Sequence, residues 1–198
     1  MGFLDNAEQH HYVTCDSLPM VGERTGDFFG YYPMHAVIEL TDGCNLSCPH
    51  CYRQARRQGY TVAVTPALLT ELHRLREYGV RVVEFTGGEP TLHPDFFAIV
   101  NEALQLFNTV GIISNGTLLR PQDIQRFSDP QKLVVQVDLD GPTAAVHQRM
   151  HGGNRRIDSF TPVLEAIRAC VRRQIFVRIA VNVSPFMRVR LRDNRCRR

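Results

Sequence analysis

The stretch "VRVVEFTGGEPTLHPDFFAIVNEALQLFNTVGIIS", residues 80–114, contains one complete unit of the fold. Its first and last six residues, 80–85 and 109–114, are rich in β-branched and aliphatic side chains, which favour strands. Between them, residues 93–107 have the apolar spacing of a helix, with Pro94 near its start. Two strands joined by a helix of this length predict a right-handed crossover between parallel strands.

The same alternation extends in both directions from this stretch. Further strands are predicted at residues 35–40, 132–139 and 175–183, and further helices at 65–79, 120–127 and 159–174. Because the strands are nearly continuous apolar runs, we expect both faces of the parallel sheet to be covered. The sequence therefore predicts an α/β fold with a parallel sheet built from about five βα units.

Two of the helices carry additional signals. In the helix at 65–79, Thr65 is expected to cap the start, Pro66 to occupy the first helical position and Gly79 to end it. The helix at 159–174 has an apolar stripe on which Cys170 also lies, so this thiol is predicted to be a core residue. The stripe consists of Val163, Ala166, Ile167 and Val171.

We predict a three-part organisation: an N-terminal extension at 1–33, a core at 34–184 and a basic tail at 185–198. The net charge is +3, but the last 11 residues hold six arginines and one aspartate, so the rest of the chain is slightly acidic. The tail is either a basic arm or the end of an interrupted reading frame. The second interpretation is favoured because the tail follows a strand and has little apolar periodicity.

The composition excludes several classes of protein. No run approaches 18 apolar residues, which argues against a transmembrane helix. The first 11 residues are polar and lack the apolar segment of a secretory signal, which predicts a cytoplasmic protein. The core has no basic stripe interleaved with aromatic residues, so neither nucleic acid nor a membrane is an expected partner. Six cysteines in such a chain indicate metal ligands or free thiols rather than disulfides.

Residues capable of chemistry follow the predicted strands. The segments are "TDGCNLSCPHCYR" at 41–53, "TGGEP" at 86–90, "SNGT" at 114–117 and "DLDGP" at 138–142. Ligands of parallel sheets bind at the carboxyl ends of the strands, where these segments should meet. Gly, Asn, Asp and Pro are ordinary turn residues, and Asp140-Gly141-Pro142 is best interpreted as a turn. The joint pattern nevertheless predicts a site at this edge.

Cys44, Cys48 and Cys51 have the spacing C-x3-C-x2-C. A buried helix face is one explanation, but Asn, Ser and Pro between the cysteines disfavour a helix. A zinc site is another, yet structural zinc takes four ligands, and the local candidate His50 directly adjoins Cys51. An iron–sulfur cube held by three thiolates is favoured, because it leaves one iron open for a substrate or cofactor.

The cysteine triplet, with His50 and Tyr52 flanking the last cysteine, resembles the radical S-adenosylmethionine (SAM) enzymes. "GGEP" at 87–90 is similar to a second motif of that family, and the resemblance covers about residues 34–184. The stretch from Asp138 onward resembles the SPASM/Twitch-type peptide-maturase branch. The resemblance implies a [4Fe-4S] cluster and SAM as cofactor. It also implies a parallel (βα) partial barrel of radical SAM type, truncated to about five βα units, of which this chain is the N-terminal part.

The resemblance also implies roles for individual residues. Cys44, Cys48 and Cys51 would each hold one iron, and SAM would chelate the fourth. The expected SAM-binding residues let the backbone approach SAM closely, accept hydrogen bonds from it, or contact its adenine and ribose. They are His50, Gly87, Gly88, Glu89, Ser114, Asn115, Asp138 and Arg149. No catalytic residue acting on the substrate is assigned.

The chain departs from this branch at the expected SAM-carboxylate site. Asp138 stands where many relatives have serine, which adds a negative charge. His151 stands where many have arginine, and Arg149 is the nearby candidate to replace it. In addition, five strands are found where the family has six βα units, and no cysteine-rich auxiliary domain follows.

The resemblance implies an enzyme that reductively cleaves SAM to a 5′-deoxyadenosyl radical, which abstracts hydrogen from a substrate. Peptide or protein modification is the leading expectation, with a ferredoxin or flavodoxin as electron donor. The alternatives are a cofactor-biosynthesis enzyme with a small-molecule substrate and a non-catalytic zinc- or cluster-binding domain.

Overall fold

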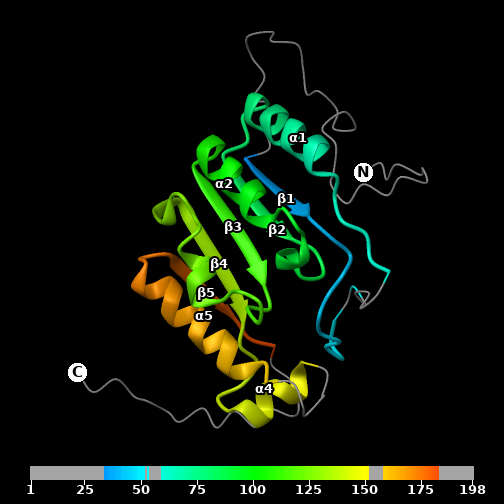
Figure 1. The fold of residues 1–198 in the computed structure, drawn as a ribbon, viewed down its shortest axis with the longest axis vertical. Coiled ribbons are helices and arrows are strands. Elements are labelled where there is room, and N and C mark those ends of the chain that lie inside the picture. The colour runs from blue at the N-terminus through cyan, green and yellow to red at the C-terminus, as the bar shows by residue number, and fades with distance from the viewer. Residues whose placement is uncertain (1–33, 52, 54–58, 152–157, 183–198) are drawn as a thin grey trace, which may run out of the picture.

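The computed structural model describes residues 34–51, 53, 59–151 and 158–182, and these form one open parallel sheet with helices (Figure 1). The strand order is β1-β2-β3-β4-β5, with every neighbouring pair parallel, as predicted. The bounds are β1 His35–Glu39, β2 Val82–Thr86, β3 Thr109–Ser114, β4 Leu133–Asp138 and β5 Phe176–Ala180. The predicted extension at 1–33 and tail at 185–198 lie outside the described residues.

The helices agree with the sequence prediction in order but differ in extent. Their bounds are α1 Thr65–Glu77, α2 Phe96–Leu106, α3 Pro121–Ile124, α4 Ala144–Met150 and α5 Phe160–Arg172, with short 3-10 turns η2 at Pro90–Leu92 and η3 at Pro130–Lys132. Of the helix predicted at 120–127, only the four residues of α3 are helical in the structure. Helix α4 was not predicted from the sequence, although Thr143 caps it by accepting a hydrogen bond from the backbone N–H of Val146.

The prediction that Thr65 caps α1 is wrong. Val64 is the N-cap residue, and Thr65 is the first residue of the helix. The Thr65 hydroxyl donates instead to the Asp95 carboxylate at 2.6 Å, which joins the start of α1 to the start of α2. The other end of α1 follows the prediction, because Gly79 has a φ of +93° in the left-handed region that glycine adopts readily.

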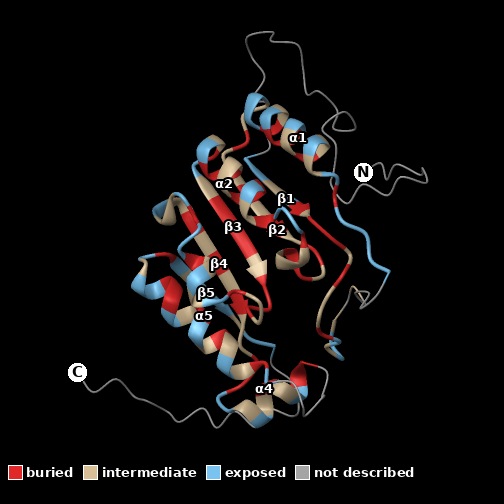
Figure 2. Cartoon of the chain, viewed as in Figure 1, coloured by how far each residue is buried: buried red, intermediate tan, exposed pale blue. Residues whose placement is uncertain are grey.

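The core lies between the sheet and the helices. Alternate residues of the strands, among them Val83, Phe85, Ile112 and Val135, are fully buried. They pack with the inner residues of α1, α2 and α5 in a single apolar cluster. In Figure 2 the buried colour therefore runs along the central strands and the inner sides of the helices, while the outer sides are exposed.

The expectation that both faces of the sheet are covered is wrong for the described part of the chain. The residues that alternate with the core residues are polar or partly exposed: Glu84 and Gln136 from the central strands, Arg178 and Phe176 from β5. Arg178 lies 3.5 Å from Glu84 and donates to Gln136 at 3.1 Å. A Cβ on Gly111 would lie 2.4 Å from the Glu84 side chain, so this glycine makes room for the pair.

The apolar stripe of α5 is narrower than predicted. Val163 and Ala166 are fully buried, Ile167 packs partly buried against the core, and Cys170 is buried as expected. Val171 is 60% exposed, so its assignment to the stripe is wrong. It lies in the last turn, on the side of the helix that faces away from the sheet.

No helix among the described residues has both the length and the apolar character needed to cross a bilayer.

These burial differences predict unequal effects of two matched substitutions on α5. Val163→Ala should lower the free energy of unfolding by about 2 kcal/mol, because it removes buried apolar surface and leaves a cavity. Val171→Ala should change it by less than about 0.5 kcal/mol, since its side chain is exposed. Urea unfolding of both variants measures the difference. Equal losses would contradict the orientation of α5.

Candidate functional site

The segment Thr41–Cys51, called the cysteine loop here, is anchored by the loop that follows β2. The Gly88 N–H donates to the Thr41 carbonyl at 2.8 Å, and the Glu89 N–H donates to the Gly43 carbonyl at 2.7 Å. The intervening Gly87 has a φ of +143°, and a Cβ there would lie 2.4 Å from the Thr41 oxygen. Glycine is therefore required at 87 for the two loops to approach this closely.

Glu89 joins the ends of β2 and β3 beneath this contact. Its buried carboxylate accepts hydrogen bonds from the Ser114 hydroxyl at 2.8 Å and from the Asn115 N–H at 2.8 Å. It also accepts from the Thr91 hydroxyl at 2.5 Å and from the Thr91 N–H at 3.2 Å. Burial raises the pKa of Glu89, and these hydrogen bonds oppose the increase. The carboxylate is thus engaged in holding the loops together.

Cys44 contacts a network of polar side chains from its own loop and from the segment that follows β3. Asn115 Nδ2 lies 3.8 Å from Cys44 Sγ and donates to Asn45 Oδ1 at 2.9 Å, while Asn45 Nδ2 donates to the Thr117 hydroxyl at 2.8 Å. The Leu46 N–H approaches the same sulfur at 3.4 Å. Burial raises the pKa of Cys44, and the hydrogen bonds from Leu46 and Asn115 lower it. Such N–H···S contacts are typical of sulfurs that ligate iron–sulfur clusters.

Cys48 and Cys51 form the end of the loop that approaches β4. The Cys51 N–H donates to the Cys48 carbonyl at 3.0 Å, which makes a tight turn around Pro49 and His50. Burial raises the pKa of Cys48 to about 12, with further increases from the charges of Cys44, Cys51, Asp138 and Asp140. All three cysteines are free thiols of intermediate exposure.

This donor set fits a cluster bearing positive iron better than a single ion. Burial keeps the Cys44 and Cys48 thiols protonated when no metal is bound, and bound iron would favour their deprotonation to thiolates. No group of three His, Cys, Asp or Glu side chains in the described residues is arranged to hold one metal ion. A cube places each thiolate on a different iron and so keeps the sulfurs farther apart than a tetrahedral ion does.

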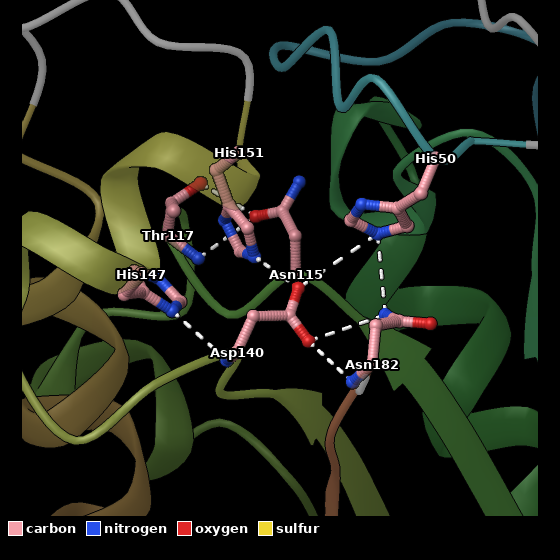
Figure 3. Close-up of polar contacts among 7 residues, drawn as sticks. All are labelled: His50, Asn115, Thr117, Asp140, His147, His151 and Asn182. Carbon is pink, nitrogen blue, oxygen red and sulfur yellow. Dashed lines mark hydrogen bonds and ion pairs between the residues drawn. The ribbon is translucent and has the colours of Figure 1, made fainter. Parts of the chain in front are cut away.

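A second group of polar residues surrounds Asp140, which lies two residues beyond β4 (Figure 3). Its carboxylate is 0% exposed and accepts from Asn182 through the backbone N–H at 2.7 Å and through Nδ2 at 3.2 Å. His151 Nε2 lies 3.2 Å away and His50 Nε2 3.7 Å away. Burial acts to raise the pKa of Asp140, but the hydrogen bonds from His151 and Asn182 hold it below its usual value.

The His147 ring completes this group. Its Nδ1 accepts a hydrogen bond from the Asp140 N–H at 3.2 Å, and the ring packs against His151 with centroids 3.9 Å apart and the ring planes tilted by 46°. Burial, followed by the charge of His151, lowers the pKa of His147 to about 4, so the ring is neutral near pH 7. Sequence reasoning missed the roles of Asp140, His147 and Asn182. The spacing of His147 and His151 by four residues was the available sign of a shared helix face.

The structure therefore brings most of the predicted site residues to the carboxyl edge of the sheet. Each is held there by its own set of contacts. The three cysteines, His50, Gly87, Gly88, Glu89, Ser114, Asn115 and Asp138 all lie in loops or strand ends at this edge. Burial and then the charge of Asp140 raise the pKa of Asp138. Arg149 lies exposed on α4, and the residues near the end of α4 that reach Asp140 are His147 and His151.

Comparison with known proteins places this site in a family. The Radical SAM superfamily model matches residues 38–188. The chain is 32% identical over 152 residues to the antilisterial bacteriocin subtilosin biosynthesis protein AlbA of Bacillus subtilis, covering 76% of this chain and 33% of the relative. It is 27% identical over 160 residues to the sporulation killing factor maturation protein SkfB of the same organism, covering 81% and 38%.

A solved structure supports the fold independently. The structure titled "Native anSMEcpe with bound AdoMet and Cp18Cys peptide" superposes with a TM-score of 0.62 at 23% identity, covering 74% of this chain and 42% of that one. The chain spans about a third of the length of the two curated relatives. The matched family model, which includes the end of β1, the cysteine loop and strands β2 to β5, shows that this chain belongs to the radical SAM superfamily.

Proposed function

We propose that the protein cleaves SAM reductively and uses the resulting radical to modify a peptide. The observation that carries this proposal is the convergence of three free, half-buried thiols and the Gly87–Gly88 turn at the carboxyl edge of a parallel sheet. Family membership supplies the chemistry, and the geometry of the loops fits it. The activity of the whole protein is part of the proposal, since the chain covers only a fraction of its relatives.

In this proposal Cys44, Cys48 and Cys51 hold a [4Fe-4S] cluster, and the fourth iron remains available to SAM. When bound, the cluster supplies the electron that splits SAM into methionine and a 5′-deoxyadenosyl radical. The protein's part is to bind and orient SAM. The Gly87–Gly88 backbone allows close approach of the methionyl group, and Glu89 fixes the conformation of that turn through Ser114 and Asn115.

The two departures from the family pattern are accommodated within the same site. Asp138 would lie near the SAM carboxylate, and burial and then the charge of Asp140 raise its pKa. His151 occupies the position of the usual arginine but is engaged with the Asp140 carboxylate at 3.2 Å. We therefore assign His151 to the support of Asp140, not to a direct contact with SAM.

A peptide substrate is supported by the relatives and by the face of the sheet that no helix of the described residues covers. The two curated relatives are described as acting in bacteriocin biosynthesis and in killing-factor maturation, and the solved neighbour is titled as holding a peptide. The face opposite the helices carries Glu39, Glu84, Gln136 and Arg178, groups that suit an extended polar chain. A small reducing protein such as a ferredoxin or flavodoxin would supply the electron.

The proposal is tested with the full protein, reconstituted anaerobically with iron and sulfide. Dithionite and SAM should yield 5′-deoxyadenosine and methionine in equal amounts, and a perdeuterated peptide substrate should transfer deuterium into 5′-deoxyadenosine. The candidate peptides to test are the products of short open reading frames that lie beside the gene. The Cys48→Ala variant is the control and should give neither product, because one iron loses its thiolate. If deuterium transferred from a small molecule but from no peptide, the cofactor-biosynthesis alternative would be favoured. If the reconstituted protein bound zinc but no iron, the proposal of radical SAM chemistry would be contradicted.

The Gly87–Gly88 turn gives a second prediction with a matched control. Gly87→Ala should lower SAM affinity about tenfold or more, equivalent to about 1.4 kcal/mol, because its Cβ would meet the Thr41 carbonyl and displace the turn. Gly79→Ala introduces similar left-handed strain, at a φ of +93°, but has nothing within 4 Å of its Cβ.

Isothermal titration with SAM measures both variants, and thermal unfolding reports the cost of strain alone. Gly79→Ala should be destabilised without losing SAM affinity. If Gly87→Ala bound SAM like the parent protein, the assignment of this turn to the methionyl group would be wrong.

A further inference from the structure

Asp140 is a fully buried carboxylate that the proposed chemistry does not use. A charged group without exposure to water requires several partners, since burial of an unpaired charge is costly. Its partners come from three separate parts of the chain, as Figure 3 shows. Asn182 follows β5, His151 ends α4, and His50 belongs to the cysteine loop.

These contacts differ from those of an ordinary turn aspartate. A turn aspartate bonds the backbone of its own turn, usually within a few residues. The Asp140 carboxylate instead accepts from a backbone N–H that lies 42 residues away in the sequence, at the end of the neighbouring strand. The hydrogen bond from the Leu139 N–H to the Ala180 carbonyl, at 2.9 Å, extends the pairing of β4 and β5 up to this point. Asp140 therefore holds the ends of these two strands together.

His50 connects this unit to the cysteine loop. Its Nε2 lies 3.7 Å from the Asp140 carboxylate and 3.2 Å from Asn182 Nδ2, and its side chain is 31% exposed. His50 lies directly before Cys51 and two residues after Cys48 in the tight turn of the loop. The start of the loop is held elsewhere, by Thr41 and Gly43 on the β2 side and by Asn45 on the β3 side.

From this arrangement we infer that Asp140 is a positioning residue that, through His50, fixes the Cys48–Cys51 turn against the ends of β4 and β5. His147 and His151 support it from α4, the first through the Asp140 N–H and the second through the carboxylate. The inference rests on the proposed function in that Cys48 and Cys51 are taken as cluster ligands. Its consequence is that the half of the loop farthest from β2 is held in place before iron binds.

The test is a double-mutant cycle on the full protein after reconstitution. Asp140→Ala and His50→Ala should each accelerate the release of cluster iron to a chelator about tenfold, the lower range found when partners that orient metal ligands are removed. The double variant should be no faster than the single variants, because both remove one connection. Glu102→Gln is the control: it alters a His–carboxylate pair with His73 between α1 and α2, away from the cysteine loop, and should leave the rate unchanged.

A readout without the cluster separates this inference from the proposed function. In the cluster-free full protein, Asp140→Ala should raise the alkylation rates of Cys48 and Cys51 by iodoacetamide, measured for each site by mass spectrometry. Cys44, held by Asn115 and Leu46, and the buried Cys170 are internal controls whose rates should stay the same. If Asp140→Ala does not fold, the exposed Asn182 serves in its place, in a cycle of Asn182→Ala with His50→Ala.

Two results would overturn the inference. In the first, the single variants leave the rates of iron release and of cysteine alkylation unchanged, or their effects on iron release multiply in the double variant. Multiplied effects would mean that Asp140 and His50 act independently. In the second, Asp140→Ala accelerates alkylation of all four cysteines equally, so that Asp140 supports the fold as a whole. A protein that takes up no cluster but shows the expected alkylation pattern would retain the positioning role and contradict the proposed function.

Discussion

The site depends on the approach of two backbones, the start of the cysteine loop and the turn after β2. Hydrogen bonds from Gly88 to Thr41 and from Glu89 to Gly43, at 2.8 and 2.7 Å, fix this approach. A Cβ at Gly87 would lie 2.4 Å from the Thr41 oxygen, so the contact is available only to glycine. This anchor sets where the segment that leaves β1 turns across the edge of the sheet. The positions of the later loop residues, and so their contacts, depend on it.

From this anchor the cysteine loop crosses the carboxyl edge and meets each neighbouring strand end in turn. Asn45 contacts Asn115 and Thr117 beyond β3, and His50 contacts Asp140 beyond β4 and Asn182 beyond β5. The contact between Arg178 of β5 and Glu84 of β2, at 3.5 Å, spans the two strands between them on one face of the sheet. Polar lining and loop placement are thus parts of one arrangement, in which the sheet presents its candidate ligands at one edge and, beside them, a polar face that no helix of the described residues covers.

The fold and the location of the site could be predicted from the sequence because both rest on local patterns. The alternation of strands and helices gave the parallel sheet, and the spacing of the cysteines with the Gly-Gly turn gave its functional edge. The predictions failed where distant contacts decide. Thr65 bonds Asp95 instead of capping its own helix, and Val171 faces away from the sheet despite its apolar character. Asp140 was interpreted as a turn residue because its partners, His50 and Asn182, lie far away in the sequence.

The central claim is that three thiolates hold a cluster and leave one iron for SAM. Mössbauer spectroscopy of the ⁵⁷Fe-reconstituted full protein, with and without SAM, measures the state of each iron. The account predicts a spectrum of one cubane per chain in which about a quarter of the iron, one site of four, changes its parameters when SAM is added. A spectrum that SAM does not alter, or iron that fails to assemble into a cubane while zinc fills the site, would contradict it.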